Sequence, residues 1–227
     1  MTLSDTQKTL AACQAELQKH LNDVASIEPL DLDALEIRAD YFGWIRKKTE
    51  ILREEKNFSI PHKIIPNKIT PRDYNYLRPD KRAIVDNYYK HDTSTGAYVI
   101  NAKKTALSLQ DAETLIHSLV IKRGKVVWVN FGFNIGHEFR GKHPAIILKN
   151  TKSVLIVIPL SSQPPSKPEI NVEVKNVHGL PHRPRWANIL RIVPISLLRV
   201  DFNSPIGDVK GDVLSEISNK ISLHGIK

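Results

Sequence analysis

Two short apolar runs close together in the middle of the chain constrain the fold more than any other feature. Residues 145–148 read AIIL and residues 154–160 read VLIVIPL. Both runs are too short for ordinary helices and rich in branched side chains, which is typical of buried strands. Residues 125–130, just before them, alternate two sets of side chains as a strand does. The sequence therefore predicts three neighbouring core strands within residues 122–163.

The loop between the first two of these strands, residues 132–143, concentrates Gly, His, Glu, Arg and Lys. Functional side chains favour loops that rigid elements hold in place. His137 and His143 stand near the end of this loop, and an unperturbed histidine pKa of about 6.5 suits proton transfer at neutral pH. Either histidine alone is more often an ordinary surface residue. As a pair in a basic loop they become candidates for an acid and a base.

Charge is distributed unevenly along the chain. The net charge of +9 divides into −3 over residues 1–60 and +12 over residues 61–227. A basic region of this size attracts polyanions, most simply nucleic acid, although it can also be an ordinary soluble surface. The single cysteine, Cys13, excludes an intramolecular disulfide and a cysteine-rich zinc site, which favours a reducing cytoplasm. No apolar run approaches the roughly 20 residues of a membrane span, and the first fifteen residues lack the basic start and apolar core expected of a secretory signal.

The first 107 residues predict two unlike regions. Apolar periodicity indicates helices over residues 5–26 and 33–56, and Pro29 between them predicts an antiparallel helical hairpin. That hairpin is either a packing or dimerisation element, or an acidic cover that restrains the basic region. Residues 58–107, rich in Pro, Lys, Arg and Tyr, predict an extended linker with little regular structure. Its tyrosines, Tyr74, Tyr76, Tyr88 and Tyr89, either pack the linker onto the barrel or stack on nucleic-acid bases.

The remainder of the chain predicts a small barrel. Ser108 is placed to cap a short helix over residues 109–119, and further strands are expected over residues 170–174 and 186–193. An amphipathic helix over residues 209–223 closes the chain. The expected fold is α+β, an SH3-like β-barrel with a C-terminal helix. The expected domains are 1–57, 58–107 and 108–227.

Three motifs in order make the C-terminal half recognisable. They are RGKVVWVNF at residues 123–131, GHEFRGKHPAIIL at residues 136–148 and VIPLSSQ at residues 157–163. In sequence and spacing they resemble the MazF/PemK (Kid) family of toxin endoribonucleases from type II toxin–antitoxin systems. The resemblance implies the same small barrel with its C-terminal helix, and it leaves the first 120 residues unexplained.

The resemblance also implies roles for single residues. A family histidine matches His137, with the acid Glu138 beside it, and the catalytic Thr or Ser of the family falls at Ser161. The family has a catalytic arginine before Pro144, where this chain has His143. That change removes a fixed cation and supplies a group that can donate or accept a proton.

A later family segment, roughly R-C-D-Q-x-R, contains a functional arginine and aspartate. At those positions this chain has Trp186 and Asn188, while the final arginine is retained as Arg191 and Arg185 stands next to the lost one. Asn188 cannot act as a base. Catalysis would therefore depend on the two histidines, Ser161 and the neighbouring arginines.

The resulting prediction is a metal-independent, sequence-selective endoribonuclease without a cofactor. It would cleave single-stranded RNA such as mRNA, leaving a 2′,3′-cyclic phosphate and a 5′-hydroxyl. The resemblance further implies a cytoplasmic homodimer with a possible antitoxin partner. The alternative is a catalytically degenerate barrel that binds nucleic acid or, like CcdB toxins, a protein target. The predicted catalytic residues are His137, His143 and Ser161, and the predicted RNA or phosphate contacts are Glu138, Arg140, Lys142, Gln163, Arg185, Asn188 and Arg191.

Overall fold

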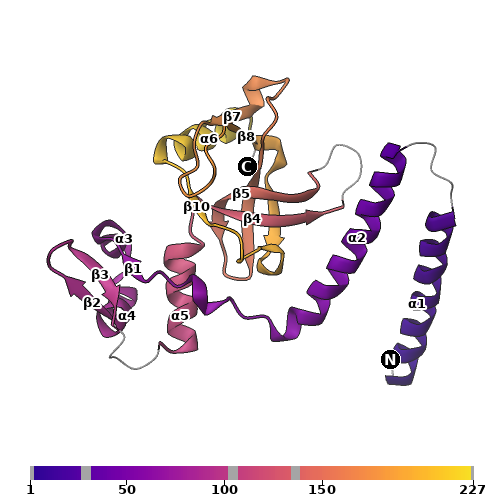
Figure 1. Cartoon of the computed structure of the whole chain (residues 1–227), viewed down its shortest axis with the longest axis horizontal. Coiled ribbons are helices and arrows are strands. Elements are labelled where there is room, and N and C mark those ends of the chain that lie inside the picture. The colour runs from indigo at the N-terminus through magenta and orange to yellow at the C-terminus, as the bar shows by residue number, and fades with distance from the viewer. Residues whose placement is uncertain (1–2, 27–31, 102–106, 134–138, 226–227) are drawn as a thin grey trace. The chain divides into compact units, whose positions relative to one another are not determined.

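The chain divides into two compact units, residues 1–53 and residues 54–227 (Figure 1). The structure is a computed structural model that describes residues 3–26, 32–101, 107–133 and 139–225. The predicted three-part division into domains stays a prediction. No helix in these described ranges is long and apolar enough to span a membrane.

The first unit consists of helices α1 (Leu3–Ser26) and α2 (Leu32–Glu54), so both predicted helices are confirmed. Their apolar side chains remain unusually accessible, with Leu10 58% and Leu17 48% exposed. Pro29 lies outside the described residues, and the pairing of the two helices as a hairpin stays a prediction.

The segment 58–101, here called the accessory segment, is folded, so the prediction of an extended linker is wrong for it. The prolines of this segment do not prevent helices, because Pro71 and Pro79 each occupy the first position of a helix, where a missing N–H costs nothing. The Thr70 side chain accepts a hydrogen bond from the Asp73 amide at 3.1 Å and caps the first of these helices. The elements are η2 (His62–Ile64), β1 (Lys68–Ile69), α3 (Pro71–Tyr76), α4 (Pro79–Tyr88), β2 (Tyr89–Asp92) and β3 (Ala97–Ile100), and the strands pair antiparallel in the order β1-β3-β2.

Three of the four tyrosines named from the sequence, Tyr74, Tyr88 and Tyr89, are structural, which confirms the packing interpretation for them. Tyr89 is 3% exposed, and the ring of Tyr74 stacks on that of Tyr98 at 4.0 Å between centroids. Only Tyr76, at 74% exposure, stands free of such packing within the segment. The hydroxyls of Tyr74, Tyr88 and Tyr89 donate to Asp86, Asp111 and the Pro66 carbonyl at 2.9, 3.1 and 2.9 Å.

Within the described residues, a curled antiparallel sheet of seven strands forms the centre of the second unit. Its order is β10-β4-β5-β6-β8-β7, with β9 also pairing with β6. Backbone hydrogen bonds of 2.9 Å in both directions join His178, just after β7, to Asp208 in β10, so the two ends of the sheet approach each other. The strands are β4 (Lys125–Gly132), β5 (Gly141–Asn150), β6 (Val154–Ser161), β7 (Asn171–Val174), β8 (Arg185–Asn188), β9 (Val193–Ser196) and β10 (Gly207–Asp208).

The central strands are apolar on both faces because each face is covered. Val127 and Val129 of β4 belong to one buried cluster, which also contains residues of the accessory segment and of α5 (Leu109–Leu115). Val126, the residue before Val127, belongs to a second cluster that contains Ile217 of the closing helix α6 (Gly211–Leu223). Continuous apolar runs in β5 and β6 follow from this two-sided burial.

The α+β class and the curled antiparallel sheet are confirmed, whereas an SH3-like closure stays a prediction. The predicted helix 109–119 is present, capped by Ser108 as expected, and its last turn continues as the π-helix η3 (Ile116–Val120). The predicted strand 186–193 is interrupted. Asn188 Oδ1 accepts a hydrogen bond from the Leu190 amide at 2.9 Å, which starts the 3-10 turn η5 (Ile189–Arg191) and ends β8.

Candidate active site

A pocket of about 320 Å³ lies where the end of β6 meets β8 and the proline-rich loop after β6. It is called the Ser161 pocket below. Ser161 and Trp186 are direct partners across the β6–β8 ladder, and Asn188 follows two residues later on β8. Side chains two apart on a strand share a face, so Trp186 and Asn188 line the same wall. Four predicted site residues converge here: Ser161, Gln163, Asn188 and Arg191.

The hydroxyl of Ser161 is engaged with the backbone. Its Oγ accepts a hydrogen bond from the Gln163 amide at 3.1 Å and lies 3.4 Å from the Gln163 carbonyl oxygen. These contacts hold the turn that leaves β6, as a strand-terminal serine often does. A role on phosphate would use the remaining hydrogen-bonding capacity of this hydroxyl.

Two aromatic side chains, Phe139 and Trp186, stand at the wall of the Ser161 pocket beside polar groups. The guanidinium of Arg191 lies over the Phe139 ring at 5.4 Å from its centroid, a cation–π arrangement that holds a positive charge at the pocket. Because Asn188 uses its Oδ1 to cap η5, its Nδ2 is the group left to meet a ligand.

His143 reaches this pocket through Phe139. It lies on β5 opposite Val129, and its half-buried ring meets the Phe139 ring edge-on at 4.5 Å between centroids. Burial lowers the pKa of His143, as does the charge of Arg183, while a hydrogen bond with the Arg140 backbone opposes the shift. The imidazole is therefore neutral at pH 7, the form that can accept a proton.

Glycines set the base of the loop that leads to His143. Gly132 and Gly141 are cross-strand partners on either side of the loop, with φ values of +90° and +78°. Only glycine adopts such angles without strain. A Cβ at Gly141 would lie 3.9 Å from the Nε2 of His143, an ordinary van der Waals distance, so glycine is favoured here by its φ angle and not by a lack of space.

Two predicted site residues, His137 and Glu138, lie outside the described residues. Arg140 is described, and its guanidinium lies over the ring of Phe133 at 5.5 Å from the centroid. It therefore stands at the loop, as predicted, and it does not line the Ser161 pocket among the residues that the structure describes.

Lys142 is engaged away from the pocket. Its ammonium pairs with the Asp201 carboxylate, donates to Ser204 Oγ at 3.0 Å and lies 5.7 Å from the centroid of the Trp128 ring. Burial raises the pKa of Asp201, yet the bond from Lys142 and further hydrogen bonds bring that pKa down to about 2. Lys142 thus neutralises Asp201 in this structure.

The prediction that Arg185 contacts phosphate is wrong, because this residue is only 1% exposed. Its guanidinium donates to the carbonyls of Arg183 and Pro181, both at 3.1 Å. Burial, together with the charge of Arg183, lowers the pKa of Arg185. A buried guanidinium that satisfies backbone carbonyls holds its loop together and is not a surface contact for phosphate.

The sequence reading omitted Phe139 and Trp186 from the site. A signal for Phe139 was present, since an aromatic residue between Glu138 and Arg140 in a charged loop has no obvious core to enter. From the sequence, Trp186 is only the residue that replaces a family arginine. Among the described residues, no group of three or more His, Cys, Asp or Glu side chains could hold a metal ion.

Comparison with protein families matches residues 122–224 to a model described as the PemK-like, MazF-like toxin of type II toxin–antitoxin systems. Comparison with curated protein sequences finds no match. Solved structures that are similar include MazF (Form-I) from Deinococcus radiodurans, at 23% identity and a TM-score of 0.39, covering 46% of this chain and 96% of that one. A MazE-MazF structure (Form-II) from the same organism has 22% identity and a TM-score of 0.36, covering 47% and 96%. The toxin MazF-mt6 from Mycobacterium tuberculosis has 15% identity and a TM-score of 0.34, covering 43% and 91%.

Proposed function

Because residues 122–224 match the family model of the PemK-like, MazF-like toxins, we propose that the chain is a toxin-type endoribonuclease. The observation that carries the proposal is the convergence of Ser161, Asn188 and Arg191 on one aromatic pocket, beside a neutral His143. The substrate is single-stranded RNA, and the reaction uses neither a metal ion nor a cofactor.

The reaction is an attack by a ribose 2′-hydroxyl on the adjacent phosphorus. The 2′-oxygen–phosphorus bond forms and the bond to the 5′-oxygen breaks, which leaves a 2′,3′-cyclic phosphate and a 5′-hydroxyl. His143 removes the proton from the 2′-hydroxyl, which its lowered pKa permits at neutral pH. His137 supplies a proton to the leaving 5′-oxygen. The charge that develops on the phosphate is stabilised by Arg191 and Arg140 and by the hydroxyl of Ser161.

The pocket wall supplies base recognition. A base unstacked from single-stranded RNA would lie against Trp186 or Phe139, since stacking on an aromatic side chain contributes about 1–3 kcal/mol per base. The amides of Asn188 and Gln163 then meet the polar edge of that base. In this proposal Trp186 replaces the family's arginine by a stacking surface, which shifts the site from charge recognition towards base recognition.

The experiment is incubation of the purified full chain with a long single-stranded RNA in EDTA. We expect discrete fragments with 5′-hydroxyl ends. His143→Ala should slow cleavage by about 10²–10⁴-fold, the usual contribution of a general acid or base. His182→Ala is the matched control, because His182 is an exposed histidine of the same unit that does not line the pocket. Equal rates for the parent and His143→Ala would refute the assignment of the base.

A second candidate function is RNA binding without cleavage. Three contacts favour it: Ser161 bonds to its own turn, Lys142 is paired with Asp201, and Arg185 is buried. Fewer groups are then free to stabilise a transition state. Salt-dependent retention of intact RNA by the parent, with no 5′-hydroxyl ends, would support this candidate and exclude the nuclease.

The partners follow from the family in the same proposal. The chain would act in the cytoplasm as a homodimer, and a separate antitoxin protein would restrain it. Light scattering of the purified chain tests the dimer, and a monomer that still cleaves RNA would show that the site is complete in one copy.

A further inference from the structure

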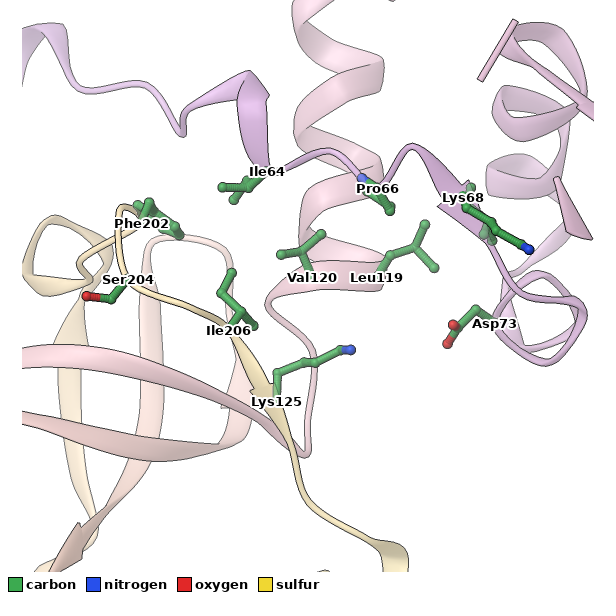
Figure 2. Close-up of a pocket in the computed structure, with 11 residues that line it drawn as sticks. Ile64, Pro66, Lys68, Asp73, Leu119, Val120, Lys125, Phe202, Ser204 and Ile206 are labelled. Atoms are coloured by element: carbon green, nitrogen blue, oxygen red, sulfur yellow. The ribbon is translucent and has the colours of Figure 1, made fainter. Parts of the chain in front are cut away.

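A second pocket, of about 390 Å³, lies where the accessory segment meets the central sheet within residues 54–227 (Figure 2). It is called the Lys68 pocket below. Among the described residues, none lines both this pocket and the Ser161 pocket, and none of the predicted site residues lines it. A ligand here would therefore be separate from the RNA site.

One half of the Lys68 pocket is apolar. Figure 2 shows Leu119 and Val120 of η3 gathered beside Ile206, with Ile64 of the accessory segment above them. Leu119 and Val120 are only 6% and 9% exposed, so what remains accessible of them faces the hollow and its mouth. An apolar floor formed by separate elements suits the hydrocarbon part of a small molecule.

The other half is charged and has one cation in excess. Lys122 pairs with Asp73, and Lys125 pairs with Asp208, both at 2.7 Å. Burial raises the pKa of Asp73, but hydrogen bonds from Lys122 and Thr70 and the charge of Lys125 bring that pKa below its ordinary value. Both aspartates are thus already neutralised by partners.

Lys68 supplies the excess charge. It lies at the rim of the pocket on the short strand β1, and no hydrogen bond or ion pair of its side chain is found within the described part of the chain. Its ammonium sits on a flexible stem, so it can turn towards a ligand at little cost. Three lysines against two aspartates leave a net charge of +1 for a ligand to balance.

We propose that the Lys68 pocket binds a small amphipathic organic monoanion, a carboxylate with a hydrocarbon body. The carboxylate pairs with Lys68, and the hydrocarbon covers Leu119, Val120 and Ile206. The pocket volume falls in the range of about 300–1,000 Å³ that small-molecule sites occupy. The hydrophobic floor disfavours a phosphate backbone, and the single excess charge matches one carboxylate.

The test uses octanoate as the probe and the full chain, with its isoleucine methyl groups labelled for NMR. Octanoate should shift the methyl signals of Ile64, Ile69 and Ile206, which line the pocket, and leave that of Ile170 in the Ser161 pocket unchanged. Octylamine and 1-octanol carry an alkyl chain one carbon longer, with the opposite charge or none. Binding of either with the affinity of octanoate would overturn the proposal, as would no binding of octanoate.

Two variants, Lys68→Gln and Ile64→Trp, test whether octanoate binds in the Lys68 pocket. Lys68→Gln should weaken octanoate binding by about two- to fivefold, the effect of one exposed ion pair. Lys90→Gln is its matched control, because Lys90 pairs with Val99 on the opposite side from Lys68 in the same three-stranded sheet and does not line the pocket. Ile64→Trp should fill the pocket and abolish binding without disturbing a buried residue. If octanoate binds both Lys68→Gln and Ile64→Trp as it binds the parent, its site is elsewhere and the proposal fails.

Discussion

Arg185 shows most clearly how one residue type can serve two opposite purposes. In the sequence it stands beside Trp186 in a basic stretch, and charge alone placed it among the phosphate contacts. In the structure two backbone carbonyls accept hydrogen bonds from its guanidinium, and almost no surface remains. Sequence cannot separate these cases, because the number of carbonyls that a loop turns inward is a property of the folded chain.

We therefore expect Arg185→Met to cost stability. The substitution keeps most of the buried volume but leaves the carbonyls of Pro181 and Arg183 without their donors, a penalty of about 1–3 kcal/mol. Urea denaturation measures the loss. Arg183→Met, at the exposed neighbour, is the control and should change the free energy of unfolding by less than about 0.5 kcal/mol. Unchanged stability with weakened RNA binding would restore the original interpretation.

A second prediction at this scale concerns pH. Burial lowers the pKa of His117, a shift that the bond between its Nδ1 and the Asn150 amide at 3.0 Å partly opposes. The unfolded chain therefore takes up a proton at this residue first. As pH falls below the ordinary histidine pKa of about 6.5, the unfolded state is favoured and stability is lost until the lower folded pKa is reached. His117→Gln should flatten this part of the stability curve, measured by denaturation from pH 7.5 to 5, and parallel curves for parent and variant would contradict it.

At the scale of elements, the hydrophobic pattern predicted helices and strands best where an element is buried on both faces or on one face only. The strands β4, β5 and β6 were found from their branched apolar runs, and α6 was found from its stripe, because in each case the core sets the pattern. The accessory segment was missed because proline was read as a breaker where it begins helices. The end of β8 was missed because one side chain, Asn188, ends the strand by capping η5.

The two kinds of helix in this chain should respond differently to the same change. Ile217 on α6 is 0% exposed in the core beneath the sheet, whereas Leu17 on α1 is 48% exposed. Ile217→Ala should destabilise the second unit by about 2–5 kcal/mol, since it removes buried volume. Leu17→Ala should shift the free energy of unfolding by no more than about 0.5 kcal/mol. Chemical denaturation followed by tryptophan fluorescence measures both, and a large loss for Leu17→Ala would show that α1 is covered in solution.

For the whole molecule, the division of charge and the division of packing nearly coincide. The buried clusters begin at Ile60 and contain only residues of the second unit. The acidic region defined from the sequence ends at the same residue. The sequence shows where the net charge changes sign, but it does not show where the packed core begins. Ile60 belongs to the core of the second unit and Phe58 packs against that core, although both lie in the acidic stretch.

A truncation tests this boundary together with the idea that the acidic helices restrain the basic region. Deleting residues 1–53 should leave the thermal unfolding of the remaining chain unchanged, because no residue of either buried cluster is removed. RNA retention and cleavage should increase, since the deletion takes away nine acidic and seven basic residues. Deleting residues 1–60 is the control. It also removes Phe58 and the 4% exposed Ile60, so it should lower the melting temperature. A lower melting temperature for the shorter deletion would contradict the boundary, and unchanged RNA retention and cleavage would contradict the restraint.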